Sequence, residues 1–196
     1  MNNYSIIIAG VGGQGVILAG NIIGDAAIAS GYDVKKTDTI GMAQRGGSVI
    51  SHLRVAPKIY SPIIGENQAD IVLSFEKMEA ARCFNFLKPG GIVILNNREM
   101  PPLSVGCGME KYPTDEEILS VLRQKTDNIH YVEGTGKSEQ IGNTKVLNIF
   151  MLGCLSQFMD IEDKVWRDSI IKSLPAKIVA INISAFEAGI QSVKQQ

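Results

Sequence analysis

The sequence predicts an α/β domain of three layers, α/β/α, in which a Rossmann-like, mostly parallel sheet is followed by C-terminal helices. Three observations support this prediction: a glycine-rich turn between a buried strand and a helix, an alternation of apolar strands with helical segments, and three successive helical segments at the end of the chain. The 196 residues, 45% of them hydrophobic, are enough for one substantial domain. We therefore expect residues 1–196 to form a single domain.

The first element is a buried strand over residues 6–9, and the sequence GVGGQG follows it at positions 10–15. Gly10, Gly12 and Gly15 have the G-x-G-x-x-G spacing, in the strand-turn-helix context that this motif requires. Glycine permits positive φ angles, and the free N–H groups at the start of the next helix suit a phosphate. The alternative is that these glycines only allow strand, turn and helix to pack closely, and the motif alone leaves both interpretations open.

The next elements are a helix over 16–30, which Gly31 ends, and a short strand over 32–37. A dinucleotide-binding fold carries an acid about 20 residues after the glycines, where it binds the ribose. Asp33 and Asp38 bracket the end of this strand, and neither has a clear position for that role. The motif therefore does not by itself establish a dinucleotide site.

The segment DTIGMAQRGG at 38–47 contains three glycines and no long apolar run, so we predict a loop with a functional role. Arg45 offers a planar guanidinium that suits a carboxylate or a phosphate. Gly46 and Gly47 allow a ligand or a partner backbone to come close. The alternative is a surface loop with a solvated Arg45, but loops at strand ends carry the sites of open α/β folds.

The remaining segments continue the pattern. A strand over 48–55 alternates apolar and polar residues, so His52 and Arg54 share a face that we expect to be solvated. A Ser-Pro pair limits residues 59–64 to a turn or an edge strand. The other expected elements are strands over 69–75, 91–96 and 128–132, helices over 76–87, 144–159, 162–174 and 179–193, and a Pro/Gly-rich loop over 98–108.

One further helix start is marked by a capping box, in which Glu117 stands three residues after Thr114, and this helix extends to about residue 125. The segment 133–142 that follows the last strand is polar and rich in glycine. The three final helices are expected to cover one face of the sheet or to reach a partner.

Composition argues against several classes of function. A formal net charge of −1 gives no indication of a nucleic-acid binder, and no apolar run approaches the roughly 18 residues of a membrane span. The first residues lack the basic region of a signal peptide. Cys83, Cys107 and Cys154 stand apart from one another, without the spacing of a metal or iron–sulfur site. We expect a cytoplasmic chain without a metal site and without an evident acid, base or nucleophile.

Five segments, in this order, resemble the gamma domain of 2-oxoacid:ferredoxin oxidoreductases. They are IAGVGGQGVILAG, GMAQRGGSVISHLRV, YSPII, ADIVLSFEKMEAAR and LKPGGIVILNN. The resemblance covers nearly the whole chain, and the pair GVGGQG and GMAQRGG is far more specific than the glycine spacing alone. Within this family, the chain is most similar to the indolepyruvate branch.

The resemblance implies an accessory subunit, not catalytic alone, of an enzyme that oxidatively decarboxylates an indolepyruvate-type 2-oxoacid to an acyl-CoA and passes electrons to ferredoxin. It implies that a large alpha subunit holds the thiamine diphosphate and the iron–sulfur clusters, so that ferredoxin is an indirect partner. By the same analogy, the two glycine loops face the partner's active site or help to hold coenzyme A. The cofactor-binding residues would then be Gly10, Gly12, Gly13, Gln14, Gly15, Arg45, Gly46 and Gly47.

Two other functions stay open at this point. One is a free-standing NAD(P)- or flavin-binding oxidoreductase, which would bind its cofactor at the glycine-rich turn. The other is a sensor of a phosphate-bearing ligand. An isolated accessory subunit is expected to self-associate, for example as a homodimer, through the surface that its partner would cover.

Overall fold

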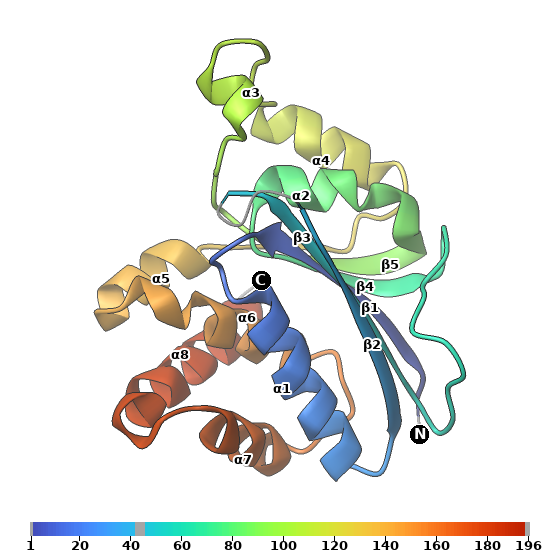
Figure 1. Cartoon of the computed structure of the whole chain (residues 1–196), viewed down its shortest axis with the longest axis vertical. Helices are drawn as coiled ribbons and strands as arrows, with labels where there is room; N and C mark the ends of the chain where they lie inside the picture. Colours follow the sequence, from blue (N-terminus) through green and yellow to red (C-terminus); the bar gives the residue numbers. More distant parts are fainter. Residues whose placement is uncertain (1, 42–45, 195–196) are drawn as a thin grey trace.

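Six strands form one sheet in the order β2-β3-β1-β4-β5-β6, in a computed structural model that describes residues 2–41 and 46–194. The strands are β1 Tyr4–Val11, β2 Asp33–Ile40, β3 Ser48–Ala56, β4 Ala69–Ser74, β5 Leu87–Asn96 and β6 Ile129–Val132. Helices cover both faces of this sheet (Figure 1). The predicted three-layer α/β/α architecture is therefore confirmed.

The direction of the strands is mostly parallel, also as predicted. β1, β4, β5 and β6 pair in parallel, whereas β3 pairs antiparallel with both β1 and β2. β3 is thus the one strand of the six that runs against the others. The short connection between β2 and β3 explains this arrangement, because a crossover to a parallel neighbour needs a dozen or more residues. As a result, β3 lies between β1 and β2.

The larger helical layer consists of five of the described helices, and it lies on one face of the sheet (Figure 1). These helices are α1 Val16–Ala29, α5 Gly134–Ile141, α6 Leu147–Ser156, α7 Asp163–Ser173 and α8 Ala176–Lys194. All ten residues of α6 are buried, and α6 packs mainly against α8. The three predicted C-terminal helices therefore cover one face of the sheet, together with α1. No helix in the described ranges combines the length and the apolar character needed to cross a bilayer.

The smaller layer holds α2 Lys77–Arg82 and α4 Asp115–Arg123 on the opposite face. A short helix, α3 Leu103–Gly106, projects beyond them at the outer end of the molecule (Figure 1). Side chains alternate between two hydrophobic clusters along β1: Ile6 and Ile8 face the layer of α1, whereas Ile7 and Ala9 face the layer of α2. The predicted capping box is present, since Thr114 and Glu117 bond each other's backbone N–H groups.

Four expectations need correction. β2 continues to Ile40, into the segment expected to be a loop. The helix expected over 76–87 ends at Arg82, a 3-10 turn follows over Phe84–Phe86, and β5 begins at Leu87, because the exposed residues around Pro89 extend the strand beyond its apolar part. The loop expected over 98–108 contains the short helix α3. The polar segment after β6, to which the sequence assigned no element, forms α5, which Gly142 ends in the left-handed conformation at φ +99°.

His52 does not lie on a solvated face, contrary to the expectation from the alternating pattern. Its side chain is buried, because the connection from β3 to β4 and the ring of Phe86 cover this part of the sheet. The backbone N–H of Ile64 donates a hydrogen bond of 3.2 Å to His52 Nδ1. Burial lowers the pKa of His52 below its ordinary value. Arg54, on the same face, is half-buried.

Candidate functional site

The glycine loop, residues 10–15, joins the carboxyl end of β1 to the N-terminus of α1. Gly13 and Gly15 have φ angles of +100° and +82°, which L side chains rarely adopt. Gly15 is the N-cap of α1, and no side chain caps this helix. The first backbone N–H groups of α1 therefore lack a side-chain acceptor, and a helix start of this kind stabilises a phosphate or a carboxylate.

Gln14 fixes the shape of this loop. The backbone N–H of Val11 donates to Gln14 Oε1 at 2.7 Å, and Gln14 Nε2 donates to the carbonyl oxygen of Phe75 at 3.2 Å. A Cβ at Gly10 would lie 2.8 Å from Gln14 Oε1, so this bonding requires a glycine there. Because both ends of its amide are engaged, Gln14 holds the loop against the ends of β1 and β4.

The two predicted glycine segments lie side by side. The backbone N–H of Gly12 donates to the carbonyl oxygen of Gly47 at 2.8 Å. Gly46 has a φ of +78°, and a Cβ there would have no neighbour within 4 Å. The structure thus brings together the predicted glycines and Gln14, whereas Arg45 lies outside the described residues.

A hollow of about 510 Å³ opens beside the glycine loop, at the carboxyl ends of the parallel strands. This volume is within the range of about 300–1,000 Å³ that is typical of small-molecule sites. Two cations, Arg98 and Lys145, and one carboxylate, Glu139, line it, and neither cation has an ion pair within the described part of the chain. The other lining residues are Gly12, Gly13, Gln14, Gly15, Leu18, Met100, Thr135, Thr144, Leu147 and Asn148.

The backbone around Arg98 is held by two buried charged residues at the start of α2. The N–H of Lys77 donates to the carbonyl oxygen of Arg98 at 3.1 Å, and the N–H of Met100 donates to Glu76 Oε1 at 3.0 Å. Lys77 Nζ also bonds Glu99 at 2.8 Å. Burial by itself lowers the pKa of Lys77, but its hydrogen bonds to two carboxylates raise this pKa above the ordinary value. Arg98 is therefore an exposed cation on a fixed backbone.

Asn148 is a buried polar residue at the inner wall of the hollow. It is 4% exposed, and its Oδ1 has no hydrogen-bond partner among the described residues. A Cβ at Gly15 would lie 2.8 Å from Asn148 Nδ2, so α6 and the glycine loop meet at this residue. A buried amide oxygen without a donor is costly, and a rotation of the amide that turns this oxygen toward the hollow would let a ligand N–H remove the cost.

Sequence reasoning missed Arg98, Lys145 and Asn148. Arg98 follows the end of β5, the position where open α/β sheets carry ligand-binding residues, and this signal could have identified it. Asn148 is a single amide in the apolar sequence LNIFMLGCLS, which was assigned to the core. Lys145 lies in the turn before α6 and carries no distinguishing signal.

The two acids considered for a ribose lie elsewhere. Asp38 accepts a hydrogen bond from Ser51 on β3 and pairs with Lys36 at 3.0 Å. Asp33, at the start of β2, accepts from the backbone N–H of Ile59 at 2.9 Å. Neither lines the hollow, because β3 separates their strand from β1. The acid arrangement of a dinucleotide-binding fold is therefore not reproduced by these two residues.

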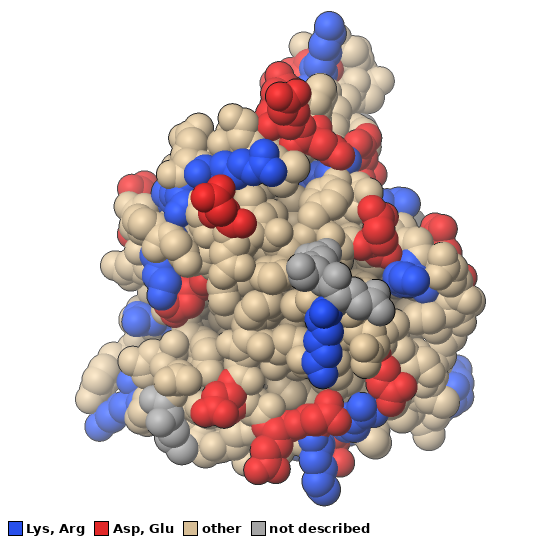
Figure 2. All heavy atoms as spheres, turned by 180° about the vertical axis from the view of Figure 1, so that it is seen from behind, with Lys and Arg blue, Asp and Glu red and all other residues tan. Residues whose placement is uncertain are grey.

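The cysteines occupy separate environments. Cys83 and Cys154 are buried, Cys107 is exposed, and burial raises the pKa of the Cys83 thiol to about 12. Over residues 2–41 and 46–194, no three His, Cys, Asp or Glu side chains group so that they could hold a metal ion. Positive and negative side chains are interspersed on the face shown in Figure 2, without a field of one sign.

Comparison with known proteins identifies similar chains over the full length. The family model described as pyruvate ferredoxin/flavodoxin oxidoreductase matches residues 5–192. The indolepyruvate oxidoreductase subunit IorB of Thermococcus kodakarensis is 36% identical over 198 residues, which cover 100% of this chain and 98% of that protein.

Two solved structures have the same fold. The gamma subunit of a keto/oxoacid ferredoxin oxidoreductase from Geobacter sulfurreducens PCA aligns with a TM-score of 0.73 at 21% identity, covering 98% of this chain and 99% of that one. The 2-oxoglutarate:ferredoxin oxidoreductase of Magnetococcus marinus, with 2-oxoglutarate, coenzyme A and succinyl-CoA bound, aligns with a TM-score of 0.78 at 18% identity. The alignment covers 100% of this chain but 32% of that longer chain.

Proposed function

Because the chain belongs to the pyruvate ferredoxin/flavodoxin oxidoreductase family, we propose that it is the gamma-type accessory subunit of a 2-oxoacid:ferredoxin oxidoreductase, with one domain over residues 1–196. The complex converts an indolepyruvate-type 2-oxoacid and coenzyme A to an acyl-CoA and carbon dioxide, and two electrons pass to ferredoxin. The full-length similarity to a relative named as an indolepyruvate oxidoreductase subunit supports this proposal.

The redox groups belong to the partner. In this proposal, a large alpha subunit carries the thiamine diphosphate, which supplies the carbanion chemistry of decarboxylation, and the iron–sulfur clusters. The separate positions of the three cysteines of this chain support that division, because a cluster needs several thiolates at one place. Free cysteines also agree with a reducing compartment, which for this complex is the cytoplasm.

The part of this chain in the reaction is to hold coenzyme A at the glycine loop. The observation that carries this role is the uncapped start of α1, which opens onto a hollow with two unpaired cations. Backbone N–H groups, Arg98 and Lys145 would bind the phosphates, and the Asn148 amide, turned so that its oxygen faces the hollow, would accept from an amide N–H of the same ligand. Coenzyme A offers both groups, and a fixed backbone around Arg98 limits the entropy lost on binding.

The experiment is a reconstitution of this chain with its partner subunit, followed by steady-state kinetics for each substrate. For Arg98→Gln and for Lys145→Gln we expect the KM for coenzyme A to rise about tenfold, about 1.4 kcal/mol, with an unchanged KM for the 2-oxoacid. Arg123→Gln, an exposed arginine on α4, is the matched control. An unchanged KM for coenzyme A in both variants would refute this role of the hollow.

Arg45 is tested in the same assay, because the sequence predicts that its guanidinium meets a phosphate or a carboxylate of the partner. For Arg45→Ala we expect a higher KM for coenzyme A or weaker assembly. If both stay at the wild-type value, Arg45 has neither role.

The isolated chain is expected to be colourless and inactive with NAD(P)H, whereas a free-standing flavin or NAD(P) enzyme would bind its cofactor alone.

A further inference from the structure

The connection between β3 and β4 contains an extended segment, residues 59–64, whose two ends are fixed. The N–H of Ile59 donates to Asp33 Oδ2 at 2.9 Å, and the N–H of Ile64 donates to His52 Nδ1 at 3.2 Å. Both isoleucine side chains are buried, Ile59 at 8% and Ile64 at 1% exposure. This backbone is therefore tied to β2 and β3 although it forms no strand.

Between these two anchors, large side chains face the solvent. Tyr60 is 85% exposed and Ile63 is 57% exposed, on either side of the half-buried Pro62. A fixed backbone that presents an aromatic ring and a branched aliphatic side chain pays little conformational entropy when it binds another surface. Large exposed apolar side chains on one short segment are typical of interaction sites.

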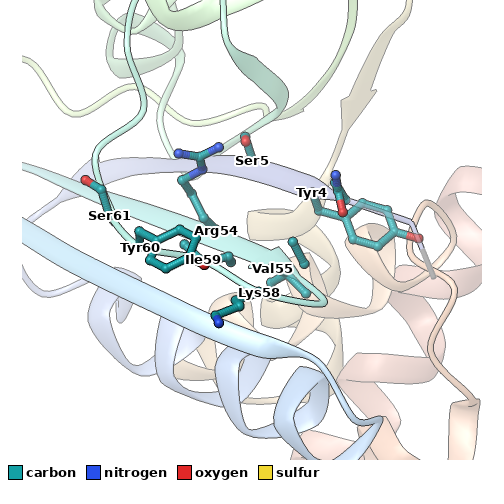
Figure 3. A pocket seen from close by; sticks show the side chains of 10 residues that line it. Tyr4, Ser5, Arg54, Val55, Lys58, Ile59, Tyr60 and Ser61 are labelled. Atoms are coloured by element: carbon teal, nitrogen blue, oxygen red, sulfur yellow. The ribbon is translucent and has the colours of Figure 1, made fainter.

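Two cations flank this segment at a hollow of about 250 Å³, at the amino end of β1 (Figure 3). The side chains of Arg54 and Lys58 extend to opposite sides of the strand ribbons, and Tyr60 and Ser61 lie beside them. Lys58 Nζ lies 5.4 Å from the centre of the Tyr60 ring. Neither cation forms an ion pair with a described carboxylate.

The nearby acids do not compensate these charges. Asp33 pairs with Lys35, and Asp70 pairs with Lys88. The surface around Tyr60 therefore has two positive charges with which no carboxylate of residues 2–41 and 46–194 pairs. An occupant with carboxylates would complement them, and such charge pairs steer association and fix its register.

The geometry favours a protein segment as this occupant. The hollow is smaller than the range of about 300 Å³ and above that holds small ligands, and its two cations diverge instead of meeting at one anion. Tyr and Arg side chains are frequent anchors of protein interfaces. A two-fold contact between two copies through this surface would bring the Arg54 and Lys58 charges of both copies into one interface without a carboxylate of the same surface to pair with them, which is unfavourable.

We propose that Tyr60, Ile63, Arg54 and Lys58 form a docking surface for an acidic segment of the partner subunit, with an apolar side chain of that segment in the hollow beside Tyr60. The inference rests on the proposed function for the existence of such a partner. It places this contact at the end of the sheet opposite to the glycine loop, so the residues of this docking surface are not the ones proposed to hold coenzyme A.

The test measures the dissociation constant of the tagged chain and its large subunit, both purified. Tyr60→Ser combined with Ile63→Ser is expected to raise it at least tenfold, and Lys58→Glu is expected to raise it and to reduce its salt dependence. The matched controls are Ile171→Ser and Lys172→Glu, which replace an exposed isoleucine and an exposed lysine on α7, in the larger helical layer. Thermal unfolding of each variant shows that the chain remains folded.

The outcomes separate the two proposals. If the wild-type complex forms and both surface variants bind within twofold of it, the docking surface is refuted while the accessory function stands. If the wild-type chain does not bind the large subunit, the accessory function fails, and the docking surface fails with it. If the surface variants change only the self-association of the chain in sedimentation, the occupant is a second copy, and the proposal is wrong.

Discussion

Two regions of this protein depend on glycine for different reasons. Where α6 crosses α8, a Cβ at Gly153 would lie 2.0 Å from the carbonyl oxygen of Phe186, and a Cβ at Gly189 would lie 2.0 Å from that of Phe150. In the glycine loop, a Cβ at Gly13 would have no neighbour within 4 Å, but φ is +100°. The crossing requires the absence of a side chain, whereas Gly13 in the loop requires only a backbone conformation. Damage to the crossing should therefore affect stability, and damage to the loop should affect binding.

The largest effect is expected at the crossing. Gly153→Ala places a methyl group against a backbone carbonyl, so the two helices must separate and the core between them opens. We expect a loss of about 3–5 kcal/mol in the free energy of unfolding, measured by urea titration. Gly136→Ala on α5 is the control, because no atom lies within 4 Å of its Cβ position, and a gain of about 0.5 kcal/mol is expected there.

The comparison would break if Gly153→Ala unfolded at the same urea concentration as the wild type. That result would mean that the two helices have room for a methyl group. The equivalent change at Gly189 provides a second test, since its Cβ would approach α6 from the opposite side.

An intermediate effect is expected for Gly15→Ala, because at this position there is no room for a side chain and the backbone is also left-handed. The φ of +82° strains any L residue by about 1–2 kcal/mol, and the new Cβ would lie 2.8 Å from Asn148 Nδ2. We expect a loss of about 2 kcal/mol in stability and a higher KM for coenzyme A in the reconstituted complex. A variant with reduced stability but an unchanged KM would show that this glycine serves packing alone.

Gly13→Ala isolates the effect of the backbone. Its Cβ would meet no atom, so only the strain of the left-handed conformation remains, about 1 kcal/mol. We expect a smaller loss of stability than for Gly15→Ala, measured in the same titration. A loss as large as that of Gly153→Ala would contradict the distinction between the two regions.

The smallest expected effect is a dependence of stability on pH. It comes from His52, which anchors the connection between β3 and β4, and not from either glycine region. Burial holds the pKa of His52 in the folded chain below 6.5, the ordinary pKa of histidine, which we take for the unfolded chain. As the pH falls below 6.5, His52 binds a proton in the unfolded chain before it does so in the folded chain. The free energy of unfolding therefore decreases between pH 6.5 and the pKa of folded His52, and His52 causes no change above pH 6.5. His52→Gln, which keeps an acceptor for Ile64, should lose this contribution, whereas Gly153→Ala and Gly15→Ala should retain it. Identical pH profiles for His52→Gln and the wild type would contradict this assignment.

Much of the fold could be predicted because its signals are local. The apolar runs of β1, β4 and β5 indicate buried strands, and the capping box of Thr114 and Glu117 marks the start of α4. The position of β3 could not be predicted, because its alternating pattern indicates a strand but neither the strands that it joins nor the connection to β4 that covers its polar face. α5 was missed because glycine and polar residues weaken its helical signal, and tertiary contacts with α6 and α8 compensate for this.

The candidate site also has a part that local sequence signals predict and a part that depends on the tertiary fold. The glycine loop was predicted, since the spacing of its glycines and the strand before it lie within one short stretch. Arg98 and Asn148 reach the same hollow from β5 and α6, and only the order of strands and the packing of α6 bring them there. The buried contacts of Glu76 and Lys77 that fix the backbone of Arg98 likewise join distant segments.

The most direct test of the account is the 2-oxoacid-dependent and coenzyme A-dependent reduction of ferredoxin by the purified chains, assayed separately and together. The account predicts that this chain alone transfers no electrons, and that adding it to the large subunit gives full activity with saturable dependence on coenzyme A. Ferredoxin reduction by this chain in isolation, or full activity of the large subunit without it, would contradict the account.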